Sequence, residues 1–428
     1  MNPIFKEYCK FLKDKVNLEL EEGYYWLDNS IIKAFDKQGN IHKLYRIVID
    51  DDLSVTYKVP KGYSSIEKID IASWDDVVKM FEKEIRERER ESLELIKKVL
   101  CDYKDYLSQI LTSGGKDSSV TMHLVRKVQS DIPGIFNNTS LDCADTYLHI
   151  KREVDNVRTI NPKEGFYQWR ERLQFIPTRF ARACCSIFKE GAMMDVLPHD
   201  EKYLFFLGMR NEESSARSSY EDMWRNIKWS DDWQGCLPIR KWTELEIWLY
   251  IMMENISFNP KYRKGYSRAG CAIACPFASK STWVLDKYWY PSMRARWEEI
   301  LKDDFISNSK WLTLNCTLEE YLKLAWNGGL FRKEPNYEVI REYSKYSGIE
   351  ENVAKQYFNK YCENGCKTRS GKLKKIKEKD VIGMNMKLHG RNINKFYCKK
   401  CLMSMHDMDN QKWDLEIQRF KDQGCQLF

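Results

Sequence analysis

The segment Leu111–Ser119, LTSGGKDSS, joins an apolar, strand-like run to a sequence with helical periodicity. A strand that runs into two glycines and then a helix gathers backbone N–H groups and the positive end of the helix dipole at one point, which favours anion binding. It is not a Walker A loop, because Ile110 stands where the earlier glycine would fall and Asp117 follows the lysine. A plain glycine turn is the alternative reading. The groups expected to bind phosphate are Ser113, Gly114, Gly115, Lys116, Ser118 and Ser119.

Strand-like runs alternate with helical sequence on both sides of this loop. YLSQILT, GIFNNTS and YLFFLGM are strand candidates, and VTMHLVRKVQ has helical periodicity. KWTELEIWLYIMMENI predicts a largely buried helix. Such alternation is typical of an α/β fold, in which helices cover both faces of a parallel sheet.

The regions outside this α/β pattern differ in composition. IIKAF and KLYRIVI flank DKQGN, which predicts a hairpin. A long charged helix follows, with Ser73 as N-cap and Asp76 completing a capping box, and its middle, EIRERERES, is expected to be a solvated bridge. The expected division is a small β-rich unit over 1–72, a linking helix over 73–107, an α/β domain over 108–332 and a basic, cysteine-containing module over 333–428.

Composition favours a cytoplasmic globular protein. The 428 residues are 31% charged, with a net charge of +7, and basic runs such as residues 367–380 concentrate this charge near the C-terminus. We expect neither a signal peptide nor a membrane span. In a reducing compartment the 14 cysteines are more naturally metal ligands, reactive thiols or core residues than a disulfide framework.

Five motifs in order resemble the phosphoadenosine phosphosulfate (PAPS) reductase family of the PP-loop superfamily, whose members cleave ATP between the α and β phosphates or bind adenylated compounds. SGGKDSS resembles the PP-loop, and NNTSLDCADTY resembles the family's second strand with its ending at Asp145, Thr146 and Tyr147. The other three are GMRNEESSAR, LPIRKWTELEIWLYI and FNPKYRKGYSRAGC. The resemblance covers residues 108 to 297 and implies a PP-loop α/β fold.

The resemblance also implies an adenine nucleotide site, for ATP or for adenylyl sulfate (APS) or PAPS, with Mg²⁺. A surface salt-bridge network is the alternative for the GMRNEESSAR residues. Arginines can clamp an anion bidentately, and Arg210 and Arg217 would share a face if this stretch were helical. The residues implied to be catalytic are Lys116, Asp117, Arg210 and Arg217. The residues implied to bind the nucleotide are the loop residues Ser113, Gly114, Gly115, Lys116, Asp117, Ser118 and Ser119, together with Gly208, Arg210, Glu213 and Ser214.

Two cysteine pairs within this region resemble the ligands of an iron–sulfur branch of the family. In that branch, which contains APS reductases and a subunit of DNA phosphorothioation systems, a Cys-Cys pair and a later C-x-x-C bind a 4Fe-4S cluster. The residues implied here are Cys184, Cys185, Cys271 and Cys275. The later pair has one additional residue between its cysteines, which requires a wider loop or a different ligand pair. Zinc and ordinary buried cysteines are the alternatives.

A second cysteine group lies near the C-terminus. The pairs in YCENGCK and YCKKCL are typical of a zinc ribbon with four thiolate ligands, which are Cys362, Cys366, Cys398 and Cys401. His389 and His406 could replace a cysteine. The surrounding lysines favour nucleic acid as a partner, with a solvated loop as the alternative.

Three functions follow from these motifs. The first is an ATP pyrophosphatase and sulfurtransferase acting in nucleic-acid sulfur modification, similar to DNA phosphorothioation, with a cysteine desulfurase or another sulfur-modification subunit as partner. The second is an APS or PAPS reductase, which needs a nucleophilic thiolate such as Cys425, although the tail DQGCQLF matches the family's E-C-G-L-H segment poorly. The third is a nucleotide-binding regulator that contacts nucleic acid.

Overall fold

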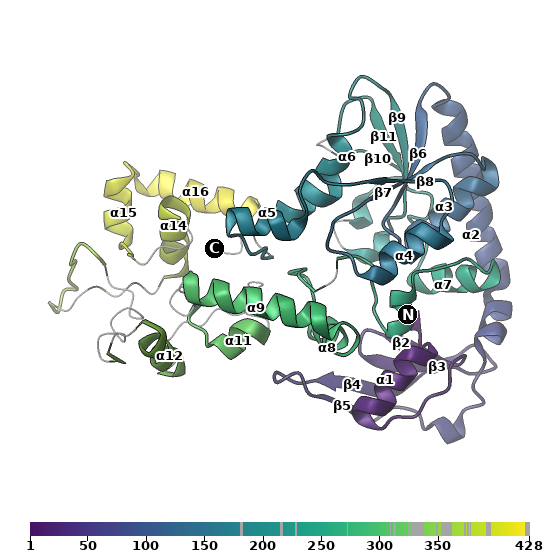
Figure 1. Cartoon of the computed structure of the whole chain (residues 1–428), viewed down its shortest axis with the longest axis horizontal. Coiled ribbons are helices and arrows are strands. Elements are labelled where there is room, and N and C mark those ends of the chain that lie inside the picture. The colour runs from purple at the N-terminus through teal and green to yellow at the C-terminus, as the bar shows by residue number, and fades with distance from the viewer. Residues whose placement is uncertain are drawn as a thin grey trace. The chain divides into compact units, whose positions relative to one another are not determined.

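The computed structural model divides the chain into two compact units (Figure 1). The first contains residues 1–169 and 183–291, and the second contains residues 170–182 and 292–428. The four-segment division expected from the sequence stays a prediction. None of the helices that the structure describes combines the length and the apolar character needed to cross a membrane. The described residues are 1–179, 183–214, 217–226, 229–271, 273–308, 310, 314–323, 326, 337–347, 350–351, 362–371, 374, 376, 378–390 and 395–423.

The first unit begins with a five-stranded antiparallel sheet in the order β1-β2-β3-β4-β5. The hairpin predicted around DKQGN is confirmed, because β3 pairs with β4 and Gly39 takes the positive φ of +86° that the turn requires. A core of apolar side chains from this sheet and α1 includes Leu12, Ile32 and Leu44. The elements are β1 (Asn2–Pro3), α1 (Lys6–Val16), β2 (Tyr25–Asp28), β3 (Ile31–Phe35), β4 (Ile41–Ile49), β5 (Val55–Lys58) and the 3₁₀ turn η1 (Ile66–Lys68).

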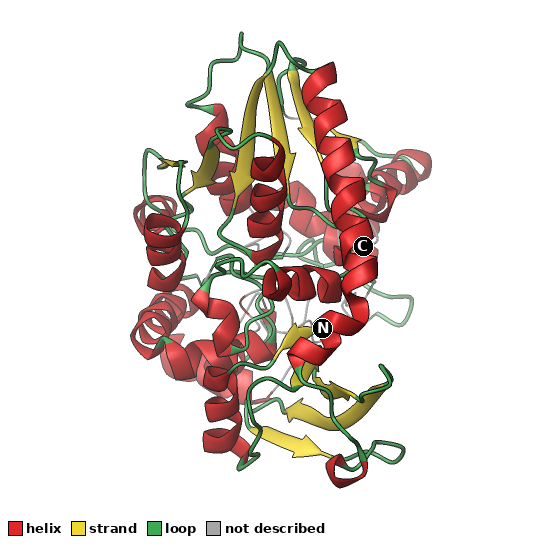
Figure 2. Ribbon diagram, turned by 90° about the vertical axis from the view of Figure 1, so that its right-hand side faces the viewer, coloured by secondary structure: helices red, strands yellow, loops and turns green. Residues whose placement is uncertain are grey.

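The long helix α2 (Trp74–Asp102) starts as predicted, because the Ser73 hydroxyl accepts the backbone N–H of Asp76 at 3.2 Å and the Asp76 carboxylate accepts that of Ser73. The expectation of a solvated bridge in its middle was wrong. Glu89 is buried there and accepts hydrogen bonds from Lys127 and from the Tyr250 hydroxyl at 2.8 Å. Helices α3 (Lys116–Val128) and α7 (Glu244–Met253) bring these partners onto α2, which runs beside the larger sheet (Figure 2).

The larger sheet has six strands in the order β10-β11-β9-β6-β7-β8 and confirms the predicted α/β fold. Its pairings are parallel except for β10 with β11. The strands are β6 (Leu107–Thr112), β7 (Gly134–Asn137), β8 (Val157–Ile160), β9 (Tyr203–Leu207), β10 (Met223–Trp224) and β11 (Trp233–Cys236). The remaining helical segments of this unit include α4 (Ala144–Glu153), part of α5 (Phe166–Leu173), the π-helix η2 (Cys185–Gly191), α6 (Ala192–Met194) and α8 (Lys280–Trp289).

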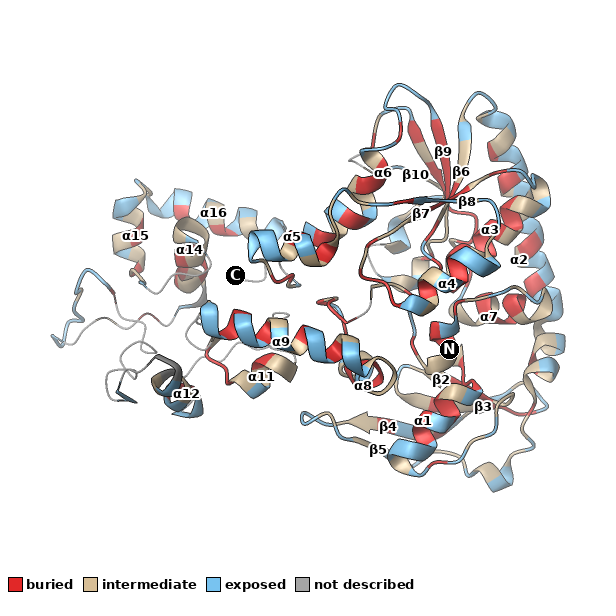
Figure 3. Cartoon of the chain, in the orientation of Figure 1, coloured by how far each residue is buried: buried red, intermediate tan, exposed pale blue. Residues whose placement is uncertain are grey.

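Strand β9 shows how this sheet is covered on both faces. Leu204 and Phe206 belong to the apolar core that contains residues of α2, α3 and α7. Tyr203 and Phe205 point the other way, into a core with Met193 of α6 and two tryptophans. The strand is almost entirely buried, and α7 is buried over its central residues 247–251 (Figure 3). Burial on both faces explains why its sequence is continuously apolar rather than alternating.

The second unit is helical in the part that the structure describes. A small apolar core joins its last three helices and includes Met384, Leu402 and Trp413. An isolated parallel bridge pairs Cys362 with Phe396. The helices are most of α9 (Pro291–Ser307), α11 (Leu318–Lys323), α12 (Tyr337–Ser347), α14 (Lys379–His389), α15 (Lys399–Met405) and α16 (Asn410–Asp422).

Candidate functional site

The candidate site begins where the order of strands in the larger sheet reverses. The chain leaves β6 toward β7 on one side, while β9 pairs with the opposite edge of β6. Since β6 and β9 are parallel and Leu111 is paired with Leu207, the loops after both strands start at the same edge of the sheet. A reversal of this kind opens a crevice at the carboxyl ends of the strands, where α/β proteins bind their ligands. The PP-loop follows β6, and Gly208 follows β9.

Side chains around the PP-loop hold its backbone in place. Gly114 has a φ of +68°, and a Cβ there would come within 3.2 Å of Thr146. The Gly114 N–H donates to the Thr112 hydroxyl at 3.1 Å, and the Lys116 N–H donates to the Tyr262 hydroxyl at 3.1 Å. The hydroxyls of Ser118 and Ser119 donate to the carbonyl of Gly115 at 2.8 and 3.2 Å, and the backbone N–H of Ser113 donates to the Ser118 hydroxyl at 3.4 Å.

Three of the four residues implied to be catalytic form one cluster of charges. The Asp117 carboxylate accepts a hydrogen bond from Arg210 Nε, and its other oxygen lies 3.3 Å from Lys116 Nζ. Lys116 and Arg210 are both buried. Burial lowers the pKa of Lys116. The charges of Tyr262, Asp117 and Glu244 raise it by more than burial lowers it, so the net shift of the pKa is upward. Both cations therefore stay charged within the cluster.

Glu244, the first residue of α7, completes this cluster and was missed in the sequence. Its Oε1 lies 3.3 Å from Lys116 Nζ, and its Oε2 accepts from the α-amino group of Met1 at 2.8 Å. Burial raises the pKa of Glu244, but Lys116, the α-amino group and Arg210 outweigh burial and lower it to about 2. A glutamate in the first turn of a helix is common, so its position in the sequence gave no sign of this contact.

Over its described residues, the GMRNEESSAR segment does not form the helix that would place Arg210 and Arg217 on one face. It forms two 3₁₀ turns, η3 (Asn211–Glu213) and η4 (Arg217–Ser219). Arg217 forms an ion pair with Glu213 and is not part of the Lys116 cluster in the residues described, while Ser214 Oγ accepts the Arg217 N–H at 3.3 Å. Gly208 has a packing role, because a Cβ there would lie 2.7 Å from the backbone of Asp117. The bend after β9 thus approaches the PP-loop too closely for any side chain.

The residues that end the second motif anchor helix α4. Asp145 pairs with Lys264, and the Thr146 hydroxyl accepts from Asn259 Nδ2 at 3.0 Å. The Tyr147 hydroxyl donates to Asn138 at 2.8 Å. Two of these partners, Asn259 and Lys264, flank Tyr262, so the same segment contacts both α4 and the PP-loop.

The cysteines implied to bind a cluster lie within electrostatic reach of one another in the first unit. The pKa of Cys184 is raised by its hydrogen bond to Cys185, by burial, and by the charges of Cys185, Cys271 and Cys275. Burial also raises the pKa of Cys271 to about 11. Cys184 immediately precedes the π-helix η2, and π-helical turns occur often at functional sites. Four thiols are a donor set whose chemistry fits an iron–sulfur cluster.

The additional residue between Cys271 and Cys275 is accommodated by an unusual backbone conformation. Ile273 has a φ of +58°, which is rare for a β-branched residue, and its side chain is buried. Such a conformation persists only where the surroundings hold it, and it is most often found at functional sites. The positive φ at Ile273 thus marks a strained position between Cys271 and Cys275.

One buried lysine connects this loop with the nucleotide site. Lys261 Nζ donates to the carbonyl of Gly270 at 2.8 Å and to that of Ala269 at 3.3 Å, immediately before Cys271. A Cβ on Gly115 would lie 4.0 Å from Ala269, so the segment that precedes Cys271 lies against the PP-loop. Sequence reasoning missed both Lys261 and Tyr262, although they stand inside the NPKYRKG segment quoted for the resemblance.

The predicted C-terminal cysteine group is confirmed as a cluster in the second unit. The sulfur atoms of Cys362, Cys366, Cys398 and Cys401 all lie within 4.8 Å of one another. Burial raises the pKa of Cys362, but backbone N–H groups outweigh it and lower the pKa to about 7. His389 and His406 lie with their Nε2 atoms 3.3 Å apart and pair with each other. Cys425 lies outside the described residues.

Comparison with known proteins agrees with this geometry. Residues 108–276 match the phosphoadenosine phosphosulfate reductase domain. An uncharacterised protein of Methanocaldococcus jannaschii is 30% identical over 267 residues, which cover 59% of this chain and 64% of that protein. The match thus spans less than two thirds of that relative. An adenosine 5'-phosphosulfate reductase of Shouchella clausii is 26% identical over 43% of this chain and 77% of that enzyme.

Among solved structures, a phosphoadenylyl-sulfate reductase from Candida auris, as a phosphate complex, is similar with a TM-score of 0.35 and 13% identity. The similarity covers 44% of this chain and 93% of that one. The matched domain contains the PP-loop, Arg210 and all four cysteines of the first group. The similarity to the phosphoadenosine phosphosulfate reductase domain thus extends over residues 108–276 of this chain.

Proposed function

We propose that the protein uses ATP to adenylate an oxygen of its acceptor, releases pyrophosphate, and then replaces that oxygen by sulfur. The observation that carries the proposal is the position of Lys116, Asp117 and Arg210 at the reversal point of the sheet, next to the chain segment that leads into Cys271. We infer that the acceptor is a nucleic acid, in a modification that resembles DNA phosphorothioation.

In the proposed reaction the PP-loop binds the β and γ phosphates of ATP. The N-terminus of α3 provides backbone N–H groups, and Lys116 provides a charge that Asp117 and Glu244 orient. An acceptor oxygen attacks the α phosphorus, and the bond from this phosphorus to the bridging oxygen breaks as pyrophosphate leaves. Arg210 and Mg²⁺ neutralise the charge that develops on the leaving group. A sulfide-level sulfur from a donor protein then displaces AMP from the acceptor.

The four cysteines of the first unit would hold a 4Fe-4S cluster in this scheme. When bound, the cluster would place iron atoms that can bind sulfur close to the nucleotide. In this scheme the chain's own contribution is the arrangement of the thiols: η2 carries Cys185, and the strained Ile273 lies between Cys271 and Cys275. We propose a cysteine desulfurase, or another subunit of a sulfur-modification system, as the sulfur donor, together with a thiol reductant that supplies two electrons to release the persulfide sulfur of the desulfurase as sulfide.

The distribution of charge supports nucleic acid as the acceptor. Residues 362–428 hold 15 of the 70 Lys and Arg residues and eight of the 63 Asp and Glu residues, so the rest of the chain carries 55 of each sign. The whole net charge of +7 therefore lies in the C-terminal module. A basic module attracts the phosphate backbone.

An APS or PAPS reductase is the second candidate, and the similarity to the Shouchella clausii enzyme favours it. In that reaction a thiolate attacks the sulfur of the sulfonucleotide, and AMP leaves from APS or adenosine 3',5'-bisphosphate from PAPS. An external thiol then reduces the enzyme-bound product to release sulfite. Cys425 would have to be this thiolate.

A product assay on anaerobically purified protein separates the two candidates. With ATP and nucleic acid, the first predicts pyrophosphate release that depends on Lys116, measured in Lys116→Met with exposed Lys98→Met as control. Sulfite with AMP from APS, or sulfite with adenosine 3',5'-bisphosphate from PAPS, would establish the reductase instead if it is lost in Cys425→Ser. Pyrophosphate release that survives in Lys116→Met would contradict the role given to the PP-loop.

The cluster is tested separately by spectroscopy. We expect a brown protein with broad absorbance near ~400 nm, as is typical of iron–sulfur proteins. This absorbance should be lost in Cys184→Ser and retained in Cys101→Ser, whose cysteine is exposed and outside both cysteine groups. A colourless wild-type protein without iron would contradict the cluster.

A further inference from the structure

The C-terminal cysteine group has the geometry of a single-ion site. We propose that Cys362, Cys366, Cys398 and Cys401 bind one structural zinc ion, and that this ion stabilises the fold of residues 362–423 rather than taking part in the nucleotide chemistry. The proposal rests on the distances between the sulfur atoms, on the loops that carry them, and on the small core around them.

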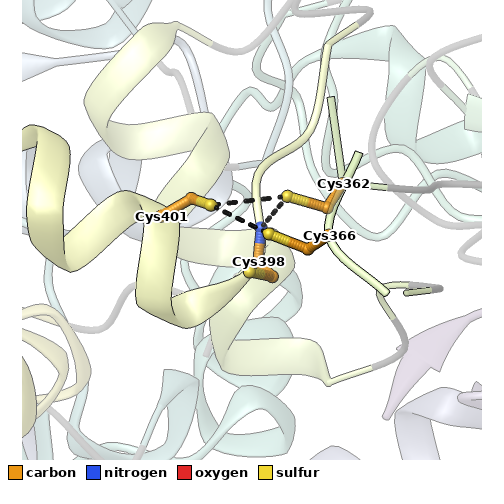
Figure 4. A group of neighbouring side chains, drawn as sticks. All are labelled: Cys362, Cys366, Cys398 and Cys401. Carbon is orange, nitrogen blue, oxygen red and sulfur yellow. Dashed lines mark hydrogen bonds between the residues drawn. The ribbon is translucent and has the colours of Figure 1, made fainter. Parts of the chain in front are cut away.

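The distances between the sulfur atoms fit one metal ion. Cys401 Sγ lies 3.6 Å from Cys362 Sγ and 3.4 Å from Cys366 Sγ (Figure 4). Tetrahedral zinc with Zn–S bonds of about 2.3 Å places its sulfur ligands about 3.8 Å apart, so only a small relaxation is needed. In a 4Fe-4S cluster each thiolate binds a different iron, and the sulfur ligands are further apart. Among the described residues, only this group brings three or more Cys, His or acidic ligand atoms within 4.8 Å of one another.

Two turns direct the thiols inward. In the loop CENGC, Gly365 has a φ of +64° and its N–H donates to the carbonyl of Cys362 at 3.0 Å, which turns the chain back toward Cys366. Cys398 is the N-cap of α15, which carries Cys401 in its first turn. The backbone N–H of Cys398 donates to Cys362 Sγ at 3.3 Å and so joins the two loops.

The charges near the site are suited to a zinc ion with four thiolates, whose net charge is −2. Lys399 and Lys400 separate the second cysteine pair, and Lys367 follows the first. The two nearby histidines pair with each other, so the donor set consists of sulfur only. A site with four protein thiolates leaves no open position for substrate or water, which is the property that distinguishes structural from catalytic zinc.

Among the described residues, the apolar core around the site is small. Its buried members, apart from two of the cysteines, are Ile376, Val381, Met384, Leu402, Trp413 and Ile417. The buried Asn385 adds hydrogen bonds to both the N–H and the carbonyl of Tyr397, at 2.7 and 2.9 Å, next to Cys398. Small modules of this kind usually need a metal or disulfides, and a structural zinc contributes its binding free energy directly to folding.

Metal analysis of the full-length protein, purified anaerobically, tests the proposal. We expect about one zinc per chain, released by a thiol-modifying reagent and detected with a chromogenic zinc chelator. The double variant Cys398→Ser/Cys401→Ser should lose at least tenfold in zinc content while its iron content stays unchanged. The variant Cys184→Ser/Cys185→Ser should show the reverse, and Cys101→Ser should change neither metal.

Limited proteolysis tests the structural role. Chelation of zinc from the wild-type protein should expose the segment after residue 362 to cleavage, while residues 1–291 remain resistant. Two results would overturn the proposal: wild-type protein without zinc whose four thiols react freely, and iron in place of zinc at this site. Both outcomes can be read from wild-type protein, so the test does not depend on whether the variants fold. Neither depends on the nucleotide reaction, so failure here leaves the proposed function untouched.

Discussion

The hydroxyl of Tyr262 accepts the backbone N–H of Lys116 at 3.1 Å, and the Lys116 ammonium lies 5.3 Å from the centre of the Tyr262 ring. This contact joins residues 146 positions apart in the chain. It couples the first turn of α3 to the segment that continues into Cys271. The arrangement of the PP-loop therefore depends on a residue outside the loop.

Replacing Tyr262 by phenylalanine should weaken nucleotide binding without unfolding the protein. The ring remains, but the Lys116 N–H loses a neutral acceptor, a contact whose net contribution is about 0.5–1.5 kcal/mol. We expect a roughly two- to twelvefold increase in Kd for ATP, measured by calorimetry. Tyr288→Phe is the control, since Tyr288 is hydrogen bonded to Asp14 and not to the loop. An unchanged Kd would show that the contact does not position the PP-loop.

Gly208→Ala should displace the PP-loop from the end of β9. The new methyl group would lie 2.7 Å from the Asp117 backbone, and overpacking of this kind costs about 1–3 kcal/mol. The midpoint temperature of thermal unfolding and the affinity for ATP should both decrease. Gly165→Ala is the matched control, because a Cβ at Gly165 would lie 3.6 Å from its nearest neighbouring atom, which is an ordinary van der Waals distance. Equal effects of the two substitutions would contradict this explanation.

Arg210→Lys should lower turnover more than it lowers affinity. Lysine keeps the charge but cannot bind Asp117 and Glu212 through separate guanidinium nitrogens. Loss of a positioned donor in a transition state typically costs a factor of about 10² to 10³ in kcat. Steady-state pyrophosphate release gives kcat and KM separately. A change confined to KM would assign Arg210 to ground-state binding.

Removal of the buried Glu89 carboxylate should destabilise the first unit strongly. Glu89→Ala leaves the buried Tyr250 hydroxyl without its acceptor, which costs about 1–3 kcal/mol, whereas the exposed Lys127 keeps its ion pair with Glu254. Glu84→Ala, on an exposed position of the same helix, should stay within about 0.5 kcal/mol of wild type. Urea unfolding followed by tryptophan fluorescence compares the two variants. Similar midpoints would show that the network contributes little.

The stabilisation contributed by Glu244 should depend on pH with a defined sign. Its pKa is lowered from 4.5 to about 2 in the folded protein, so its contribution is complete above pH 4.5 and is lost as the pH falls toward 2. The difference in urea midpoint between wild type and Glu244→Gln should therefore be constant above about pH 5 and shrink at lower pH. A difference that grows on acidification would contradict the lowered pKa.

The sequence predicted the fold well where a structural feature depends only on residues that are neighbours in the chain. The Ser73 cap, the DKQGN hairpin and the buried aromatic helix are each determined within a few residues, and the structure has all three. The middle of α2 was misjudged because Glu89 and Ser92 look solvated in isolation. Their burial depends on Lys127, Tyr250 and Pro238, which only the tertiary fold brings to them.

The site was predictable as far as its motifs extend. PP-loop and cysteine positions follow from spacing, whereas the contacts of Glu244, Tyr262 and Lys261 cross long stretches of chain and leave no local pattern. The pairing of Arg217 with Glu213 could not be inferred either, since it depends on two 3₁₀ turns in place of a helix.

If both cysteine groups bind metal as proposed, the left-handed residues in the two C-x-x-x-C loops imply that the two sites form in different ways. Glycine reaches this conformation at no steric cost, so the loop at Gly365 can take its shape as the ion arrives. Isoleucine does not, and the buried Ile273 keeps its conformation through the packing around it. We therefore expect the thiols of the first unit to await their cofactor in a finished pocket, which makes maturation there a loading step. At the C-terminal site, acquiring the metal and acquiring the fold would be a single event.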